Sequence, residues 1–346
     1  MRAVCWYGPK DIRVEEREKP AVIDPDDAIL KVTTAAICGS DLHLYHGKVP
    51  KVRPGTTIGH EFVGVVDSVG PGVRTLRPGT RCLASMSIAC GRCSACLAGN
   101  HLGCDHFALF GYGEMFGGLA GGQAEYVRVP LADMTLSPIP PGLADEEILF
   151  AGDILATAYT GCVAGGIQHG EVVVVVGAGP VGQLAAECAM LFAPASVFVV
   201  DVVADRLRHV AALGAIPIDA STGDPLQQLR GHTGGARADV VIEAVGNAGG
   251  LDTAWRLAAT GARLALVGFL VDEPFPQSAG QTWMRALTVT PVLGQPIRYR
   301  HRLTRLIQAG RLRPARIISE SVELDAVPDT YERLDRRELT KVLITP

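Results

Sequence analysis

The stretch Val172-Val173-Val174-Val175-Val176-Gly177-Ala178-Gly179-Pro180-Val181-Gly182 decides the fold of this 346-residue chain. Five consecutive valines predict a strand buried on both faces, and residues 183–191 continue with a helix-like pattern. Three glycines at this spacing, between a strand and a helix, are typical of a turn that binds a dinucleotide. Gly177 allows the tight turn, Gly179 lets the backbone approach a pyrophosphate, and Gly182 lets the helix pack closely on the strand. A tight strand–helix turn without a ligand is the alternative.

The strand that follows this turn ends in an acidic residue. The apolar run 197–200 leads directly into Asp201, about 20 residues beyond the glycines. A carboxylate at this position accepts hydrogen bonds from the ribose 2′- and 3′-hydroxyls, and it repels a 2′-phosphate because the two charges have the same sign. The sequence therefore predicts NAD(H) rather than NADP(H). The alternative is that Asp201 only caps a helix.

The apolar runs around this motif predict a doubly wound sheet. Runs 172–176, 197–200, 240–242 and 264–267 alternate with helix-like stretches. Strands that are buried on both faces by crossover helices show continuous apolar runs of this kind. We therefore expect a parallel α/β sheet of the Rossmann type.

The first 150 residues have a different texture. Short alternating runs, such as 28–33, 62–69 and 124–129, are broken by glycine and proline and predict a β-rich, barrel-like domain. A helical-looking segment, 145–164, follows this region. The C-terminal residues, with a closing strand near 341–344, are expected to return to the first domain. The predicted fold class is α/β, with a Rossmann sheet and a β-rich barrel.

Composition limits the choice of partners. Hydrophobic residues make up 48% of the chain, 20% are charged and the formal net charge is −4, as in a globular protein. The basic run 298–305 has Leu303, Leu306 and Ile307 at helical spacing, which favours a solvated helix face over a nucleic-acid contact. The N-terminus lacks the apolar core of an export signal, and the run 172–176 is too short for a bilayer. We expect a cytoplasmic protein with no nucleic-acid or membrane partner.

The nine cysteines indicate metal binding, because a reducing compartment disfavours disulfides. Four of them, Cys90, Cys93, Cys96 and Cys104, are crowded into a glycine-containing lobe at 88–106, with two, two and seven residues between them. Four thiolates match a closed tetrahedral zinc site, which indicates a structural role. An iron–sulfur cluster is the alternative, because it too can use four thiolates.

A second set of potential ligands is dispersed along the chain. Cys38, His60 and Asp153 lie in separate apolar stretches, and Glu61 directly follows His60. A catalytic zinc needs a few protein ligands and one open position for water or a substrate oxygen. Taken singly, each residue also has an ordinary explanation: a small buried residue for Cys38, a core histidine for His60 and a helix cap for Asp153.

We favour Asp153 over Glu61 as the third ligand beside Cys38 and His60. Adjacent residues in a strand point to opposite faces, so His60 and Glu61 reach one ion only if the backbone bends. One thiolate, one neutral imidazole and one carboxylate also leave a zinc ion formally neutral, whereas a further carboxylate would weaken it as a Lewis acid. We expect Glu61 to lie nearby and to coordinate only transiently.

Over essentially its full length, the chain resembles the zinc-containing medium-chain alcohol dehydrogenases. It is similar to bacterial formaldehyde dehydrogenase-like and polyol dehydrogenase-like members with an aspartate zinc ligand. The motifs that carry the resemblance are Cys38-Gly39-Ser40-Asp41-Leu42-His43, Gly59-His60-Glu61, the four-cysteine lobe, 153–159, the glycine turn with Asp201, and Gly121-Gly122-Gln123-Ala124-Glu125-Tyr126-Val127-Arg128-Val129-Pro130.

The resemblance implies a domain organisation and a set of partners. A GroES-like catalytic domain would comprise residues 1–154 and 296–346, with a Rossmann domain, 155–295, inserted and the active site between them. Two zinc ions per chain, NAD(H) and a small alcohol or carbonyl substrate are implied, as is a homodimer or homotetramer.

The resemblance also implies residue roles. Ser40 would take the alcohol proton and pass it through a ribose hydroxyl to His43. Asp41 would orient His60, and Thr157 would contact the nicotinamide. Residues implied to contact the dinucleotide are Gly177, Gly179, Pro180, Val181, Gly182, Asp201, Arg206 (adenosine ribose), Val267, Gly268 and Phe269 (nicotinamide side), and Lys341 (pyrophosphate, where the family more often has arginine).

The sequence also allows other functions. A polyol or threonine-type amino-alcohol dehydrogenase would use the same machinery with a more polar pocket. The expected pocket residues, Met86, Phe110, Phe269 and Leu293, are mostly apolar and favour an unhydroxylated or aromatic substrate. A third hypothesis is a non-catalytic NAD-binding relative. The presence of both Ser40 and His43 argues against it. A zinc-free quinone reductase would lack both ligand sets.

Overall fold

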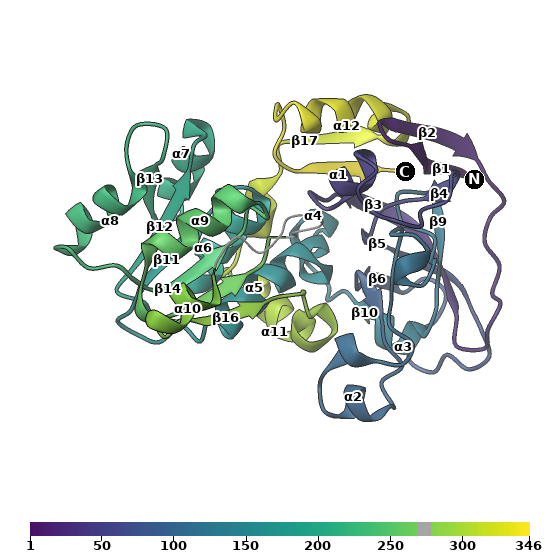
Figure 1. Cartoon of the computed structure of the whole chain (residues 1–346). Helices are drawn as coiled ribbons and strands as arrows, with labels where there is room; N and C mark the ends of the chain where they lie inside the picture. Colours follow the sequence, from purple (N-terminus) through teal and green to yellow (C-terminus); the bar gives the residue numbers. More distant parts are fainter. Residues whose placement is uncertain (269–277) are drawn as a thin grey trace. The chain divides into compact units, whose positions relative to one another are not determined.

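The computed structural model of the chain describes residues 1–268 and 278–346. The chain forms two compact units, Met1–Ala156 with Gln295–Pro346, and Thr157–Gly294. The first unit therefore consists of two separate pieces of chain, and the second unit is inserted between them in the sequence (Figure 1).

The first unit is built on two sheets that are mostly antiparallel. A seven-stranded sheet has the order β10-β6-β5-β3-β18-β17, with β9 also paired to β3, and a three-stranded sheet has the order β2-β1-β4. The GroES-like, β-rich fold predicted for this part of the chain is confirmed. The strands of the unit are β1 (Arg2–Gly8), β2 (Asp11–Glu16), β3 (Ala28–Ile37), β4 (Thr56–Thr57), β5 (Glu61–Val69), β6 (Arg81–Ala84), β7 (Ser87–Ile88), β8 (Ala108–Leu109), β9 (Tyr126–Val129), β10 (Leu136–Pro138), β17 (Glu320–Glu323) and β18 (Val342–Thr345).

Most helices of the first unit are short and lie in the connections between strands. The longer helices, α11 (Pro296–Gln308) and α12 (Val327–Asp335), come from the C-terminal piece and bury apolar faces that include Leu303 and Tyr331. The others are α1 (Asp41–Tyr45), α2 (Ser94–Leu97), α3 (Ala132–Thr135), α4 (Asp145–Ile148) and the 3-10 helices η1 (His101–Gly103), η2 (Glu114–Phe116), η3 (Leu149–Gly152), η4 (Pro314–Ile317) and η5 (Leu324–Ala326).

Strand register in the first unit brings distant residues to one place. Ala36 near the end of β3 pairs with Glu61, the first residue of β5, and Ile37 pairs with Val342, the first residue of β18. The residues that flank these strand ends, Cys38, His60 and Lys341, therefore lie close together although they are far apart in the sequence.

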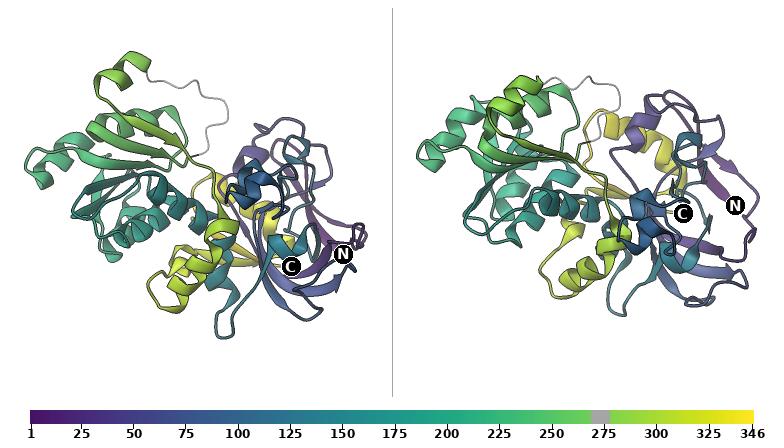
Figure 2. Two further views of the ribbon diagram at one scale, coloured as in Figure 1. Left: turned by 90° about the horizontal axis from the view of Figure 1, so that it is seen from below. Right: turned by 60° about the horizontal axis from the view of Figure 1, so that its bottom comes forward.

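The second unit is a doubly wound sheet. Its six strands have the order β13-β12-β11-β14-β15-β16, and every neighbouring pair is parallel. The Rossmann fold predicted from the valine run is confirmed, and Figure 2 shows the strands with their flanking helices from two further directions. The elements are β11 (Val172–Val176), α6 (Pro180–Met190), β12 (Ser196–Asp201), α7 (Ala204–Ala212), β13 (Ile216–Asp219), α8 (Pro225–Thr233), β14 (Ala238–Glu243), α9 (Ala248–Leu257), β15 (Ala258–Leu266), α10 (Ala279–Met284) and β16 (Thr288–Pro291).

The segment 145–164, which looks helical in the sequence, is not one continuous helix. Helix α4 ends at Ile148 and η3 ends at Gly152. Helix α5 (Ile154–Ala164) begins after Asp153, whose backbone has φ −151° and ψ −93°. A side chain at Gly152 would meet the carbonyl oxygen of Ala84 at 2.1 Å, so the chain passes close to β6 at the break. The interruption turns the Asp153 side chain out of the helical register.

The longest helix of the described residues, α11, has 13 residues. No single helix there is long and apolar enough to cross a bilayer, although the bent pair Asp145–Gly152 and Ile154–Ala164 passes the same test when taken together. Ala151, Leu155 and Ala156 of this pair are fully buried in the protein.

Candidate metal and dinucleotide sites

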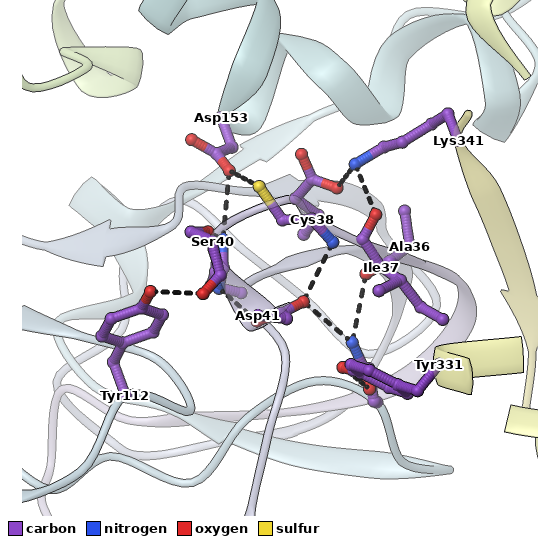
Figure 3. Close-up of polar contacts among 12 residues, drawn as sticks. Ala36, Ile37, Cys38, Ser40, Asp41, Tyr112, Asp153, Tyr331 and Lys341 are labelled. Atoms are coloured by element: carbon purple, nitrogen blue, oxygen red, sulfur yellow. Dashed lines mark hydrogen bonds and ion pairs between the residues drawn. The ribbon is translucent and has the colours of Figure 1, made fainter. Parts of the chain in front are cut away.

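Three potential metal ligands from separate parts of the first unit converge. Cys38 directly follows β3, His60 directly precedes β5, and Asp153 lies between η3 and α5. Figure 3 shows the side chains of Cys38 and Asp153 next to each other. All three are buried, with exposed fractions of 7%, 5% and 5%. Their ligand atoms lie within 4.8 Å of one another, so the set could hold a metal ion.

The spacing of these atoms fits a tetrahedral zinc ion. Asp153 Oδ2 is 3.7 Å from Cys38 Sγ and 3.3 Å from His60 Nε2. With Zn–S near 2.3 Å and Zn–N and Zn–O near 2.0–2.2 Å, tetrahedral angles place sulfur and oxygen about 3.6 Å apart, and nitrogen and oxygen about 3.4 Å apart. Three ligands at these separations leave a fourth position for a substrate oxygen.

Residues of the turn after Cys38 surround the imidazole of His60. The Ser40 hydroxyl lies 3.1 Å from His60 Nε2, on the side of the ligand set. On the other side of the ring, Asp41 Oδ1 lies 3.3 Å from His60 Nδ1, while Asp41 Oδ2 accepts a hydrogen bond of 2.9 Å from the Cys38 main-chain N–H. His43 follows on the same short helix, α1.

Glu61 is not among the three converging ligands; its Oε2 contacts the ammonium of Lys341 instead. Lys341 Nζ also donates to the carbonyl of Ile37 at 2.9 Å, and both Glu61 and Lys341 are 1% exposed. Within the described residues, Glu61 Oε1 has no hydrogen-bond partner. The sequence prediction that Lys341 contacts a pyrophosphate would require its ammonium to leave this carboxylate.

The electrostatics of this region favour a cation. Burial raises the pKa of Glu61 to about 7, although Lys341 opposes the shift. Burial also raises the pKa of the Cys38 thiol, and Glu61 and Asp153 raise it further. For His60, burial alone would lower the pKa, but Asp41 and Asp153 raise it well above its ordinary value. The buried carboxylates thus favour positive charge at this site, and a divalent ion would stabilise the Cys38 thiolate and the Asp153 carboxylate together.

The four-cysteine lobe forms the second group. The sulfur atoms of Cys90, Cys93, Cys96 and Cys104 all lie within 4.8 Å of one another. Sulfur atoms about 2.3 Å from one tetrahedral ion lie about 3.8 Å apart, so the lobe has the size of a four-thiolate zinc site.

Main-chain N–H groups of the lobe point at its sulfur atoms. The N–H of Cys90 donates to Cys104 Sγ at 3.2 Å, and that of Cys93 donates to Cys90 Sγ at 3.4 Å. The N–H groups of Cys96 and Asp105 lower the pKa of the Cys93 thiol to about 6. These N–H groups favour the thiolate form of Cys93, which is the form that binds metal, whereas burial raises the pKa of the Cys96 thiol to about 12.

The glycine turn of the second unit has the geometry that its sequence predicts. Gly177 adopts φ +99°, and a side chain at Gly182 would meet the Gly177 carbonyl at 1.8 Å, so helix α6 packs directly on the turn. A side chain at Gly179 would meet nothing within 4 Å, which leaves space beside the start of α6. Pro180 and Val181, the first residues of α6, are half-buried.

Asp201 lies at the carboxyl end of β12 and contacts this turn. Its Oδ2 accepts a hydrogen bond of 2.6 Å from the Ala178 N–H, and its Oδ1 accepts bonds from the N–H groups of Val202 and Val203. The half-buried Arg206 follows on α7. The carboxylate is thus held at the edge of the sheet where an adenosine ribose would bind.

The other residues predicted to contact the nicotinamide lie after β15 and at the start of the second unit. Val267 and Gly268 follow β15, and a side chain at Gly268 would meet the Gly246 N–H nitrogen at 2.2 Å. Phe269 lies outside the described residues. Thr157 begins the second unit, where a side chain at Gly294 would meet its hydroxyl at 2.1 Å.

Two of the residues that were predicted to line the substrate pocket, Phe110 and Met86, lie in the core of the first unit. Phe110 is fully buried and packs edge-to-face on Phe62, 5.1 Å between ring centres, so it belongs to the core of the first unit. This contact with Phe62 accounts for an aromatic residue at position 110. Met86 is 4% exposed and also belongs to that core, whereas Leu293 of the second unit is 43% exposed.

Two residues near the candidate site were not identified from the sequence. The Tyr112 hydroxyl donates a hydrogen bond of 2.6 Å to the Ser40 carbonyl, and its ring meets that of His60 edge-to-face at 5.7 Å. Gln123 donates to Asp41 Oδ2 at 3.2 Å. Neither residue type has a motif of its own, although Gln123 lies in the stretch 121–130, which carries part of the family resemblance.

A buried Cys–His–Asp set in a GroES-like unit, together with a Rossmann unit that carries a glycine turn, defines a metal-dependent dehydrogenase. The comparisons with known proteins agree. A model of the alcohol dehydrogenase GroES-like domain matches residues 24–141, and a model of zinc-binding dehydrogenases matches residues 180–309.

Individual relatives extend this agreement over the whole chain. A probable zinc-binding alcohol dehydrogenase of Mycobacterium tuberculosis is 35% identical over 96% of this chain and 84% of its own length. The structure of alcohol dehydrogenase TADH from Thermus sp. ATN1 is 41% identical, with a TM-score of 0.93 over 100% of this chain and 99% of that one. A putative zinc-binding dehydrogenase from Sinorhizobium meliloti 1021, bound to NADP, is 32% identical, with a TM-score of 0.88 over 100% and 99% of the two chains. The chain belongs to the family of zinc-dependent medium-chain alcohol dehydrogenases and is an alcohol oxidoreductase.

Proposed function

We propose that the chain transfers a hydride between a small primary or secondary alcohol, or its aldehyde or ketone, and NAD(H), with a catalytic zinc on Cys38, His60 and Asp153. The observation that carries the proposal is the convergence of these three buried ligands at separations that suit one tetrahedral ion. Glu61 is proposed to coordinate only during exchange, and its contact with Lys341 supports this.

Zinc bound there supplies a Lewis acid that lowers the pKa of a substrate hydroxyl toward neutrality. The Ser40 hydroxyl lies beside the ligand set, 3.1 Å from His60 Nε2, and can accept the proton that the substrate hydroxyl loses. His43, on the helix that Ser40 begins, is proposed to receive this proton through a ribose hydroxyl. Asp41 stabilises the His60 tautomer with the proton on Nδ1, which leaves Nε2 free to bind.

The proposed cofactor preference rests on Asp201. Its carboxylate lies beside the glycine turn, and the residues directly after it, Val202, Val203 and Ala204, carry no charge that could neutralise a 2′-phosphate. Arg206 is the nearest cation along the chain. The NADP bound to the Sinorhizobium meliloti relative makes NADP(H) the competing outcome.

A single substitution tests this preference. Asp201→Ser removes the like charge and should reduce the ratio of kcat/KM for NAD to that for NADP by about 10-fold or more, since about 1.4 kcal/mol is a factor of ten. Asp205→Ser, an exposed carboxylate four residues further on, is the matched control and should leave the ratio unchanged. A wild-type chain that prefers NADP by tenfold would contradict the proposal.

The experiment that tests the activity is a spectrophotometric screen of the purified chain with NAD(H) and NADP(H). The panel should contain aliphatic, aromatic, polyol and amino-alcohol substrates. An unhydroxylated or aromatic substrate is expected, because the pocket residues predicted from the sequence are mostly apolar. Turnover confined to polyols or to threonine-like substrates would contradict this substrate class. Binding of NAD without turnover of any alcohol would contradict the catalytic proposal.

We also propose that the lobe cysteines Cys90, Cys93, Cys96 and Cys104 hold a second, structural zinc. A homodimer or homotetramer is proposed as the assembly. It is supported by the edge strand β16 and by Trp283 and Met284 on α10, which are 78% and 72% exposed. Light scattering of the purified chain tests the assembly, and a monomer would contradict it. Thiols available for metal also support a cytoplasmic location.

A further inference from the structure

A buried chain of hydrogen bonds leads from the C-terminal helix α12 to the candidate zinc site. The Tyr331 hydroxyl donates to Gln123 Oε1 at 3.1 Å. Gln123 Nε2 donates to Asp41 Oδ2 at 3.2 Å and to the Ala36 carbonyl at 3.3 Å. Tyr331, Gln123 and Asp41 are each 0–1% exposed, and Figure 3 shows Tyr331 below Asp41 and Ala36.

The partners fix the orientation of the Gln123 amide. A carboxylate and a main-chain carbonyl only accept hydrogen bonds, so the amide NH₂ must face Asp41 and Ala36. The amide oxygen then faces Tyr331, the only one of these partners that can donate. Because every contact in this arrangement is a donor–acceptor pair, Gln123 holds one side-chain orientation.

The chain of bonds also determines which oxygen of Asp41 is available to His60. Gln123 and the Cys38 N–H both donate to Asp41 Oδ2. The other oxygen, Oδ1, faces His60 Nδ1 at 3.3 Å, and within the described residues neither of these two atoms has a hydrogen-bond partner. A small tightening of this pair would complete the hydrogen bond that fixes the histidine for metal binding.

Gln123 is also bound to the segment that carries His60. Its main-chain N–H donates to the Ile58 carbonyl at 3.0 Å, and the Gly122 N–H donates to the Gly59 carbonyl at 2.9 Å. A side chain at Gly59, which adopts φ +95°, would meet Gln123 Cγ at 2.4 Å. Gln123 therefore contacts both the turn of Cys38 and Asp41 and the segment that leads into His60.

We propose that Gln123, oriented by Tyr331, is a positioning residue that acts through Asp41 to hold His60, and with it the Cys38 turn, in the geometry that retains the catalytic zinc. This inference rests on the proposed function only in assuming a metal on Cys38, His60 and Asp153. It predicts that removal of the Gln123 amide weakens metal retention at this site and leaves the four-cysteine lobe unaffected.

The test compares three variants of the whole, zinc-loaded chain. Gln123→Leu removes the amide with little change in volume, and Tyr331→Phe removes only the hydroxyl that orients it. Tyr45→Phe is the matched control, because Tyr45 is buried and stacks on Tyr331 with 5.7 Å between ring centres, yet contacts no part of Gln123 that the structure records. The rate of zinc release to a chromogenic chelator is measured for both ions, with the lobe zinc as internal reference. The visible spectrum after cobalt substitution reports the geometry of the site.

Loss of a direct partner of a metal-binding histidine commonly reduces metal affinity about 10–100-fold. Gln123 acts one step further out, through Asp41, so Gln123→Leu should release one zinc faster by about 10-fold, the lower end of that range. Tyr331→Phe should act in the same direction by a smaller factor, with a changed cobalt spectrum. Both should lower kcat while the KM for NAD stays within about twofold of wild type. Tyr45→Phe should match wild type in every measurement.

Several outcomes would overturn the inference. One is that the Gln123→Leu variant folds and has the zinc release rate and the cobalt spectrum of the wild type. Another is that Tyr331→Phe and Tyr45→Phe have equal effects on these measurements. If Gln123→Leu does not fold, Tyr331→Phe decides alone. A wild-type chain that holds two zinc ions but oxidises no alcohol would contradict the proposed function, while the release rates would still decide this inference. A wild-type chain with only the lobe zinc would overturn both.

Discussion

The two groups of metal ligands in the first unit are built in opposite ways. The four cysteines of the lobe lie within 15 consecutive residues, and main-chain N–H groups of the same loop donate to their sulfur atoms. Cys38, His60 and Asp153 come from three distant positions and meet because β3 pairs with β5 and because the helical segment 145–164 is interrupted at Asp153.

This difference in construction corresponds to a difference in chemistry. A short loop can surround an ion with four thiolates, which closes the site and suits a structural metal. Ligands from separate strands and a helix start are held by the core of the unit, so three of them can be fixed rigidly while one position stays open. The lobe should therefore affect stability first, and the dispersed set should affect activity first.

The largest effect is expected for Asp153→Asn. The amide cannot supply the negative charge that neutralises zinc together with the Cys38 thiolate, so the chain should lose one zinc. kcat/KM should then fall by about 100-fold or more, since even outer partners change affinity 10–100-fold. Metal analysis and steady-state kinetics measure both quantities.

Asp133→Asn provides the control for that variant, because Asp133 is a hydrogen-bonded carboxylate of the same unit that lies outside both groups. It should keep two zinc ions and wild-type kinetics. If Asp153→Asn retained two zinc ions and full activity, the dispersed set would not be the catalytic site. The proposed difference in function between the two ligand groups would then be wrong.

Cys90→Ser should affect stability more than chemistry. Loss of one of four thiolates should release the lobe zinc, because a structural metal contributes its binding free energy to folding. We expect a Tm lower by roughly 10 °C, with kcat within a few-fold of wild type. Calorimetry and elemental analysis test this expectation.

Cys82→Ser is the matched control, since Cys82 is fully buried but belongs to neither group. It should lose no zinc. Two zinc ions per chain in Cys90→Ser would contradict the structural assignment of the lobe.

The smallest effect on activity is expected for Glu61→Gln. The amide keeps an acceptor for the buried Lys341 ammonium but removes the charge, so both zinc ions should remain and kcat should fall less than about 10-fold. A lower Tm is expected as well, because Lys341 would lose its buried carboxylate. If Glu61→Gln lost a zinc ion and Asp153→Asn did not, Glu61 would be the third ligand.

Much of this protein could be predicted from its sequence. The valine run and the three glycines predicted the parallel sheet because strand burial, the turn at Gly177 and close packing at Gly182 are local requirements. The four-cysteine site of the lobe could be predicted for the same reason, because all four cysteines lie close together in the sequence. Their short spacing leaves few conformations in which they do not face one ion.

Other features depended on the tertiary structure, because they arise from strand register and from interrupted helices that local patterns do not encode. The pairing of Ala36 with Glu61 brings Cys38 to His60, and the break at Asp153 lies where Gly152 passes close to β6. Phe110 was expected in a pocket but packs in the core, since an aromatic side chain looks the same in both places. Lys341 faces Glu61, and Tyr331 reaches Gln123, only because the C-terminal residues return to the first sheet. A residue's type limits the chemistry it can perform, and the fold decides which other groups lie within reach.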